Sequence, residues 1–206
     1  MSSEVIVHKS KYNKRLEVRW EKGKKLLDTP NTNYSYGTLV DVLKFGLNKI
    51  PLKQAKNALI LGFGAGSIVE PLRYQYGIKG EIVGVEIDPV VIEIAETEFG
   101  ISPQDDLQII QDDVWDFVQR PQSKFDLIII DIFIDLKVPD KFYRQEFWQR
   151  VKRLCNDNAF VLFNAGIDLS ETFVEKFADT IPEEFVYQIA YNVLKTNTLI
   201  SLQKVF

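Results

Sequence analysis

Continuous apolar runs that alternate with amphipathic stretches dominate this chain of 206 residues. Apolar runs are typical of strands buried on both faces of a parallel sheet, and apolar residues three or four positions apart indicate helices. The pattern predicts strands at 57–62, 81–87, 107–111, 125–130, 158–164, 184–191 and 197–205. It predicts helices at 36–49, 67–76, 89–98, 140–153 and 170–179. This alternation, which ends in a strand pair, predicts a doubly wound, mostly parallel, seven-stranded α/β sheet.

The N-terminal segment follows a different pattern. Leu16-Glu-Val-Arg-Trp20 alternates apolar and polar residues, and Glu21-Lys-Gly-Lys24 is a turn signal, so residues 4–28 are predicted to form a short β-hairpin. We therefore divide the chain into a hairpin appendage at 1–33 and a Rossmann-like domain at 34–206. Residues 1–25 carry eight Lys and Arg against three Glu. Lysines commonly protect exposed edge strands, which favours this interpretation over a nucleic-acid surface. The same edge could pair in a homodimer.

Composition narrows the classes of function. Hydrophobic residues make up 46% and charged residues 26% of the chain, as in globular domains. No apolar run reaches membrane-spanning length and Met-Ser-Ser-Glu does not open a signal peptide, so we expect a cytoplasmic protein. A single cysteine, Cys155, excludes an internal disulfide and a cysteine metal cluster. A single histidine, His8, argues against a histidine metal site, so no bound metal is expected.

A glycine turn after the first parallel strand is the main candidate for ligand binding. Gly62, Gly64 and Gly66 follow the apolar run 59–61 and precede a helix. The next strand ends at Glu86, and an acid at that position can accept hydrogen bonds from both ribose hydroxyls. A dinucleotide fingerprint requires a glycine where this chain has Ser67, which argues against a nicotinamide cofactor. The G-x-G-x-G spacing instead resembles the first motif of class I S-adenosylmethionine-dependent transferases.

From Tyr34 to about Gly166 the chain resembles the spermidine synthase family and its methyltransferase-like relatives. The resemblance rests on the segments Ile60–Gly66, Val85–Pro89, Asp113–Phe117, Phe125–Asp131 and Phe142–Trp148. It implies S-adenosylmethionine or its decarboxylated form as donor, held by Gly62, Gly64, Gly66, Glu86, Ile87, Asp113 and Val114. It also implies Asp131 as the catalytic residue, with Tyr36 and Asp135 near the acceptor. Asp113 could alternatively do no more than cap the short helix that follows it.

The departures from the family pattern concern the groups that hold an aminopropyl tail and a diamine. Ala65 stands where aminopropyltransferases carry an aspartate in the glycine loop. Ile134 stands where they carry a second acid after the fourth strand, and an acid follows one position later, at Asp135. Their Tyr-His-Glu is replaced by Tyr36-Gly-Thr38. Methyl transfer to a small acceptor is therefore our first interpretation, and aminopropyl transfer in polyamine biosynthesis is the alternative.

The expected group transfer needs few catalytic side chains. A sulfonium donor is already activated, and orientation of the two reactants can supply roughly 7–11 kcal/mol of the barrier. If the acceptor is an amine, Asp131 could hold it and take up its proton. Two interpretations from other classes stay open, namely a NAD-dependent oxidoreductase and a non-catalytic nucleoside-binding protein.

Overall fold

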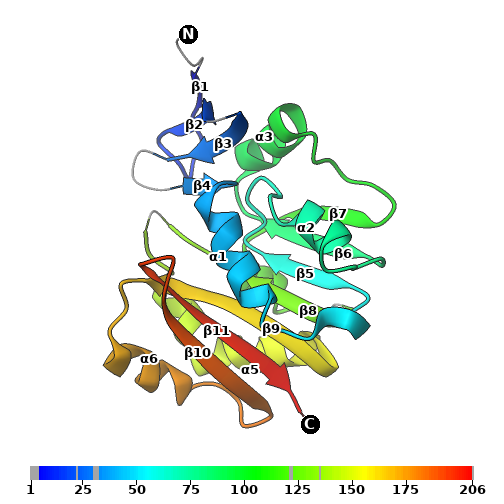
Figure 1. The fold of residues 1–206 in the computed structure, drawn as a ribbon, viewed down its shortest axis with the longest axis vertical. Coiled ribbons are helices and arrows are strands. Elements are labelled where there is room, and N and C mark those ends of the chain that lie inside the picture. Colours follow the sequence, from blue (N-terminus) through cyan, green and yellow to red (C-terminus); the bar gives the residue numbers. More distant parts are fainter. Residues whose placement is uncertain (1–4, 22, 30–32, 121–122, 135, 206) are drawn as a thin grey trace.

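A computed structural model of the chain describes residues 5–21, 23–29, 33–120, 123–134 and 136–205. A large twisted sheet with helices on both faces forms most of the molecule, and a small antiparallel sheet lies at its N-terminal end (Figure 1). The predicted fold class, a doubly wound sheet with an N-terminal β appendage, is confirmed.

The central sheet has seven strands. From one edge to the other they are β10 (Phe185–Val193), β11 (Asn197–Lys204), β9 (Cys155–Ile167), β8 (Phe125–Ile130), β5 (Ala58–Leu61), β6 (Ile82–Glu86) and β7 (Leu107–Gln111). The five strands from β9 to β7 are parallel, and β11 and β10 add an antiparallel edge. The chain proceeds from β5 to β7 on one side and returns to β8 on the other. The order of the strands therefore reverses between β5 and β8.

The helices cover both faces of this sheet. They are α1 (Thr38–Leu47), α2 (Val69–Tyr74), α3 (Pro89–Phe99), α4 (Val114–Phe117), α5 (Gln145–Leu154) and α6 (Glu171–Ala178), with a 3₁₀ turn η1 (Leu52–Gln54) after α1. Alternate residues of β8 serve opposite faces: Leu127 and Ile129 pack with α1 and α2, whereas Ile128 and Ile130 pack with α4 to α6. Burial on both faces explains why this strand is an unbroken apolar run.

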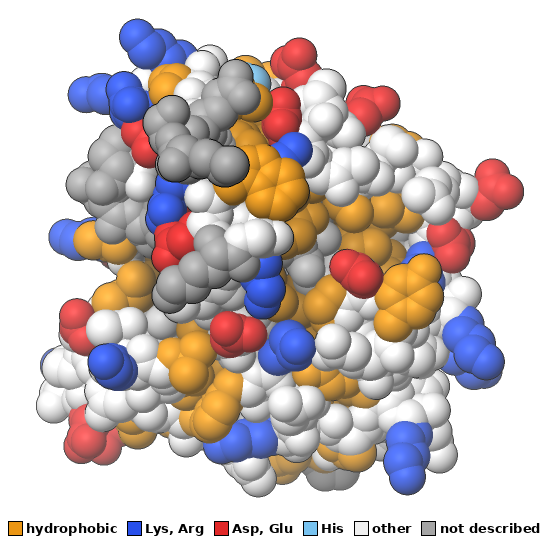
Figure 2. Space-filling view, turned by 45° about the horizontal axis from the view of Figure 1, so that its top comes forward, with side chains coloured by type: hydrophobic (Ala, Val, Ile, Leu, Met, Phe, Trp, Pro, Cys, Tyr) orange, Lys and Arg blue, Asp and Glu red, His pale blue; other side chains and the backbone are white. Residues whose placement is uncertain are grey.

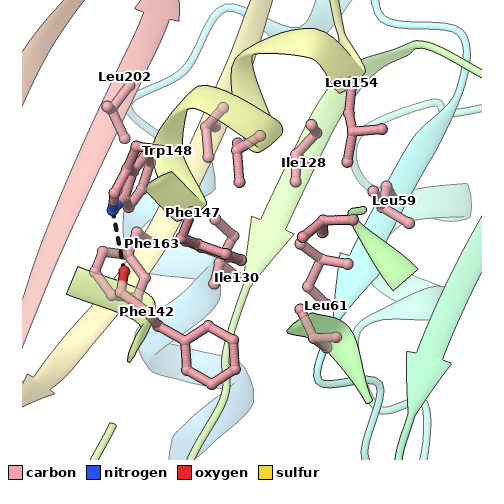
Figure 3. Packing of buried hydrophobic residues seen from close by; sticks show 14 of the residues in the cluster. Leu59, Leu61, Ile128, Ile130, Phe142, Phe147, Trp148, Leu154, Phe163 and Leu202 are labelled. Carbon is pink, nitrogen blue, oxygen red and sulfur yellow. Dashed lines mark hydrogen bonds between the residues drawn. The ribbon is translucent and has the colours of Figure 1, made fainter. Parts of the chain in front are cut away.

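Aromatic side chains fill the face under α5 (Figure 3). Phe147 and Trp148 of α5 and Phe163 of β9 are fully buried, and their rings meet edge to face. The indole Nε1 of Trp148 donates a hydrogen bond to the backbone oxygen of Phe142 at 3.1 Å. A buried indole N–H needs such a partner. This bond fixes the segment that follows β8 against the core.

Two predicted boundaries were wrong. The helix expected at 140–153 is a 3₁₀ turn, η2 (Asp140–Tyr143), followed by α5, because Arg144 adopts an extended conformation at φ −78° and ψ 144°. In a continuous helix the Phe142 oxygen would bond to the backbone four residues on, whereas here it accepts the Trp148 indole. Strand β9 is also longer than the predicted 158–164, because Asn158 at φ 62° lets a polar stretch join the ladder.

The N-terminal sheet is larger than a hairpin. The predicted hairpin corresponds to β2 (Leu16–Glu21) and β3 (Lys24–Asp28), and the structure adds β1 (Val5–His8) and β4 (Asn33–Ser35) on either side. The sequence pattern missed both because they are three or four residues long. The division at residues 33 and 34 and the homodimer stay predictions. Several Lys and Arg side chains gather around this sheet, at the upper left of Figure 2.

The small sheet shares a core with the central domain. Leu16, Val18 and Leu27 of the sheet pack with Ala65 of the glycine loop and with α3. Asp88, which caps α3 by accepting a bond from the Val90 amide, is fully buried and also accepts hydrogen bonds from Ser10 and Asn13. The N-terminal sheet therefore supports the loop that follows β5.

Candidate active site

One cavity of about 340 Å³ opens at the carboxyl ends of the parallel strands. Ligand sites of proteins have volumes of about 300–1,000 Å³, so the cavity is large enough for a nucleoside. Its lining includes most of the predicted site residues, namely Gly62, Gly64, Glu86, Ile87, Asp113, Val114 and Asp131. Ligands of doubly wound sheets bind where the strand order reverses, and this cavity lies there.

Two predicted residues, Gly66 and Tyr36, stand apart from this lining. Gly66 does not line the cavity; a Cβ there would lie 2.7 Å from Ile101, so its small size serves packing. Tyr36 also lies outside the lining, with its ring stacked 4.2 Å from that of Phe99. Its hydroxyl donates to the Ala65 oxygen at 3.4 Å, and burial raises its pKa. Asp135 lies outside the described residues.

Gly62 is required where the ends of β5 and β8 approach each other. It has φ +87°, and a Cβ at this position would lie 2.2 Å from the backbone oxygen of Asp131. The amides of Gly62 and Phe63 both donate to the Val85 oxygen, at 3.0 and 2.9 Å. The glycine turn is thereby fixed between the β6 end that bears Glu86 and the β8 end that bears Asp131.

Glu86 ends β6 and points its carboxylate at the glycine turn. Its Oε2 accepts from the Gly64 amide at 2.9 Å and its Oε1 from the Asp88 amide at 3.0 Å. Burial raises the pKa of Glu86, and the hydrogen bonds from these amides oppose that rise. Each oxygen has a further lone pair for a donor, so the residue can accept two hydroxyl groups of a ribose.

Asp113 lies at the far end of the cavity and has two partners in the structure. Its Oδ1 accepts from the Trp115 amide at 2.8 Å, which makes Asp113 the N-cap of α4. Lys141 of η2 donates to both carboxylate oxygens, at 3.1 and 2.9 Å. Asp113 therefore caps α4 and also lines the cavity, and its contact with a ligand stays a prediction. No local sequence pattern indicates Lys141, because its partner is 28 residues away.

Asp131 follows β8 directly and is held by one side chain. The Nδ2 of Asn164 on β9 donates to its Oδ1 at 3.0 Å. Enclosure of the carboxyl by protein atoms raises its pKa from the ordinary 3.8 to about 7, and the bond from Asn164 opposes the rise. A carboxyl with a pKa near neutrality in a cleft has the properties of a general base.

Asn164 is a cavity residue that the sequence analysis missed. It is fully buried, it lines the cavity, and its Oδ1 has no hydrogen-bond partner among the described residues. The available signal was a polar residue directly after the apolar run 160–163, the same signal that identified Asp131.

The described part of the chain lacks two features. None of its helices is long and apolar enough to cross a membrane. No group of three or more His, Cys, Asp or Glu side chains in the same residues is arranged to hold a metal ion.

Comparison with known proteins identifies a matching family and several sequence relatives. The spermine/spermidine synthase domain model matches residues 38–206. A probable polyamine aminopropyl transferase of Bifidobacterium longum is 29% identical over 64% of this chain and 29% of its own length. Polyamine aminopropyltransferase 2 of Caldanaerobacter subterraneus is 28% identical over 66% of this chain and 48% of its own length. The chain thus matches half or less of the length of these relatives.

Solved structures show the same fold. The spermidine synthase of Thermotoga maritima superposes with a TM-score of 0.70 at 14% identity, covering 97% of this chain and 72% of that one. Human methyltransferase-like protein 13, solved with SAH, superposes with a TM-score of 0.67 at 19% identity, covering 83% of each chain. Fold and cavity position define the class, that of the methyltransferase-like α/β proteins. Within it, the chain belongs to the spermine/spermidine synthase domain family.

Proposed function

We propose that the protein transfers an aminopropyl group from decarboxylated S-adenosylmethionine to an amine held by Asp131. The family match and the aminopropyltransferase relatives support this alternative over methyl transfer, our first interpretation, which has weaker support from the comparisons. The observation that carries the proposal is how many carboxylate oxygens in the described lining already have a hydrogen-bond donor. Glu86 is held by backbone amides and Asp113 by Lys141, whereas the Oδ2 of Asp131 has no donor among the described residues.

The donor would bind across the carboxyl ends of β5, β6 and β7. Glu86 would accept the ribose hydroxyls, and the glycine turn would pass under the nucleoside. Ile87 and Val114 offer apolar contacts to the base, and Asp113 an acceptor for its exocyclic amine once Lys141 shares or releases that carboxylate. The bound donor supplies a carbon activated by a sulfonium group.

Asp131 would act on the acceptor. The amine nitrogen uses its lone pair to form the new C–N bond while the C–S bond breaks and its electron pair stays on sulfur. The nitrogen then carries a positive charge and an extra proton, which passes to the Asp131 carboxylate and on to water. A carboxyl pKa of about 7 suits this step, because about half of the groups are ionised at pH 7 and the carboxylate still accepts a proton.

Methyl transfer is the second candidate, and Ala65 favours it. This residue is fully buried against the N-terminal sheet, and its amide donates to the Ser35 hydroxyl at 3.3 Å. The loop therefore lacks the acid that would hold the ammonium of an aminopropyl tail, and Ala65 itself does not line the cavity.

Calorimetry with each donor, followed by mass spectrometry of the products formed with primary amines, separates these functions. We expect tighter binding of the decarboxylated donor and an aminopropylated amine as product. A methylated product would establish the second candidate. If neither nucleoside bound, the whole proposal would be wrong, and binding without turnover would define a nucleoside-binding protein. Glu86→Gln, which retains the shape of the side chain without its charge, is the control for binding at this site.

A further inference from the structure

The unpartnered oxygen of Asn164 indicates a ligand that brings an N–H or O–H donor to this end of the cavity. Its orientation follows from its neighbour, because an ionised Asp131 only accepts and the amide nitrogen of Asn164 must face it. The Oδ1 of Asn164 is then left without a donor in the described residues, although buried acceptors are nearly always paired. A ligand seated here would satisfy both this oxygen and the Oδ2 of Asp131.

The wall beyond this pair is aliphatic. Ile167 lies on β9 three residues after Asn164, and it pairs with Asn197 at the start of β11. Leu194 stands in the turn between β10 and β11, and α1 closes the cavity from the other side. The apolar residues of this wall are Leu39, Val42, Leu43, Phe133, Ile134, Ile167 and Leu194.

A second charged group of the acceptor would find no partner among the described residues of this wall. Thr38, Thr196 and Asn197 are its polar members, and all three are uncharged. An ammonium group placed against aliphatic side chains loses its hydration without compensation. An alkyl chain placed there gains from the removal of apolar surface from water.

We infer that the acceptor is a primary monoamine with an aliphatic tail, whose nitrogen donates one hydrogen bond to Asp131 and one to the Oδ1 of Asn164. Two N–H groups of a neutral amine make these two bonds, and its lone pair remains for the reacting carbon. Asn164 is in this scheme a positioning residue. The inference rests on the proposed transfer to an amine and adds the class of that amine.

Hexylamine, butylamine and 1,4-diaminobutane are the probes, with the donor that calorimetry identifies. We expect kcat/KM for hexylamine to exceed that for 1,4-diaminobutane at least tenfold, with butylamine between them. A preference for the diamine would overturn the inference, and so would equal rates. In Asn164→Ala we expect KM for hexylamine to rise about tenfold while donor affinity changes less than twofold. Loss of donor binding in this variant would instead assign Asn164 to the donor site or to the fold.

Leu194 provides a matched pair of variants that leaves the core intact. It is 50% exposed and has φ 47°, a conformation that Asp and Asn tolerate better than Leu. Leu194→Asp places a carboxylate in the wall and should raise the diamine-to-hexylamine ratio at least fivefold, whereas Leu194→Asn should leave it unchanged. An unchanged ratio in Leu194→Asp contradicts the inference. Asp135 follows Ile134 in the sequence, and Asp135→Asn tests whether its carboxylate affects the choice of acceptor. A preference for hexylamine that is unchanged in this variant supports the inference, and a preference that appears only in this variant contradicts it.

Failure of the proposed transfer can be told apart from failure of this inference. If the donor binds and no amine reacts, transfer to amines is wrong, and calorimetry of hexylamine and 1,4-diaminobutane on the donor-loaded protein tests the inference directly. Stronger binding of hexylamine supports the monoamine site. Stronger binding of the diamine, or binding of neither, overturns it.

Discussion

Replacing Asp131 with Asn should make the protein more stable and less active. The raised pKa of Asp131 means that folding favours its protonated form, so the ionised carboxylate costs stability at neutral pH. Asn removes this charge and still offers Asn164 an oxygen to bond.

The size of the gain follows from the pKa. A rise from 3.8 to about 7, at 1.36 kcal/mol per pKa unit, corresponds to about 4 kcal/mol. Asp131 faces the cavity and is half-buried, so water there screens its charge, and we expect about 2 kcal/mol. Between pH 3.8 and about 7 the unfolded chain has released the Asp131 proton, whereas the folded protein still binds it. Because the unfolded chain binds fewer protons there, the stability of the wild type falls as the pH rises through this range. The advantage of Asn is therefore greatest at pH 8 and falls below 1 kcal/mol, roughly, at pH 4.

Urea unfolding of both proteins at pH 4 and pH 8 measures this difference. Asp105→Asn is the matched control, because Asp105 is an exposed carboxylate before β7 and its replacement should change stability by less than about 0.5 kcal/mol. The same Asp131→Asn protein should lose turnover by about 10²–10⁴-fold, with donor affinity changed much less. An Asn variant that is less stable at pH 8, or whose advantage does not depend on pH, would refute the argument from burial.

Three further outcomes are expected. Glu86→Ala should weaken donor binding by about 1.5–3 kcal/mol in calorimetry, the scale of hydrogen bonds to a charged group, and unchanged affinity would remove Glu86 from the site. Gly62→Ala should lower the Tm well beyond Gly77→Ala, because both glycines have positive φ but only the Cβ at Gly62 meets a backbone oxygen; equal losses would contradict the contact. The kcat/KM of the wild type should rise with pH through about 7 as Asp131 ionises, and a flat profile between pH 5.5 and 8.5 would show that no proton acceptor is needed.

The sequence predicted the strands and helices, because these follow from the spacing of apolar residues. It also predicted the acids that directly follow buried strands. The central strands were found because burial on both faces makes them apolar throughout, and Glu86 and Asp131 were found because each acid directly follows such a run. The break at Arg144 was missed because the residues on both sides have helical spacing, and a tertiary bond from Trp148 replaces the helical one.

The pairings across the site were not predictable. Nothing local indicates that Lys141 reaches Asp113 or that Asn164 faces Asp131, since each pair joins two elements brought together by the sheet. The placement of Tyr36 against Phe99 depends in the same way on how the N-terminal sheet docks.

The docking of that sheet on Ala65 links two parts of the molecule thermodynamically. Leu16 and Val18 of β2 pack on the glycine loop without lining the cavity. A ligand that orders this loop must also restrain the side chains that rest on it, so filling the cavity should slow amide hydrogen exchange in β2. Strand β2 would then report occupancy of a cavity that its own residues do not line.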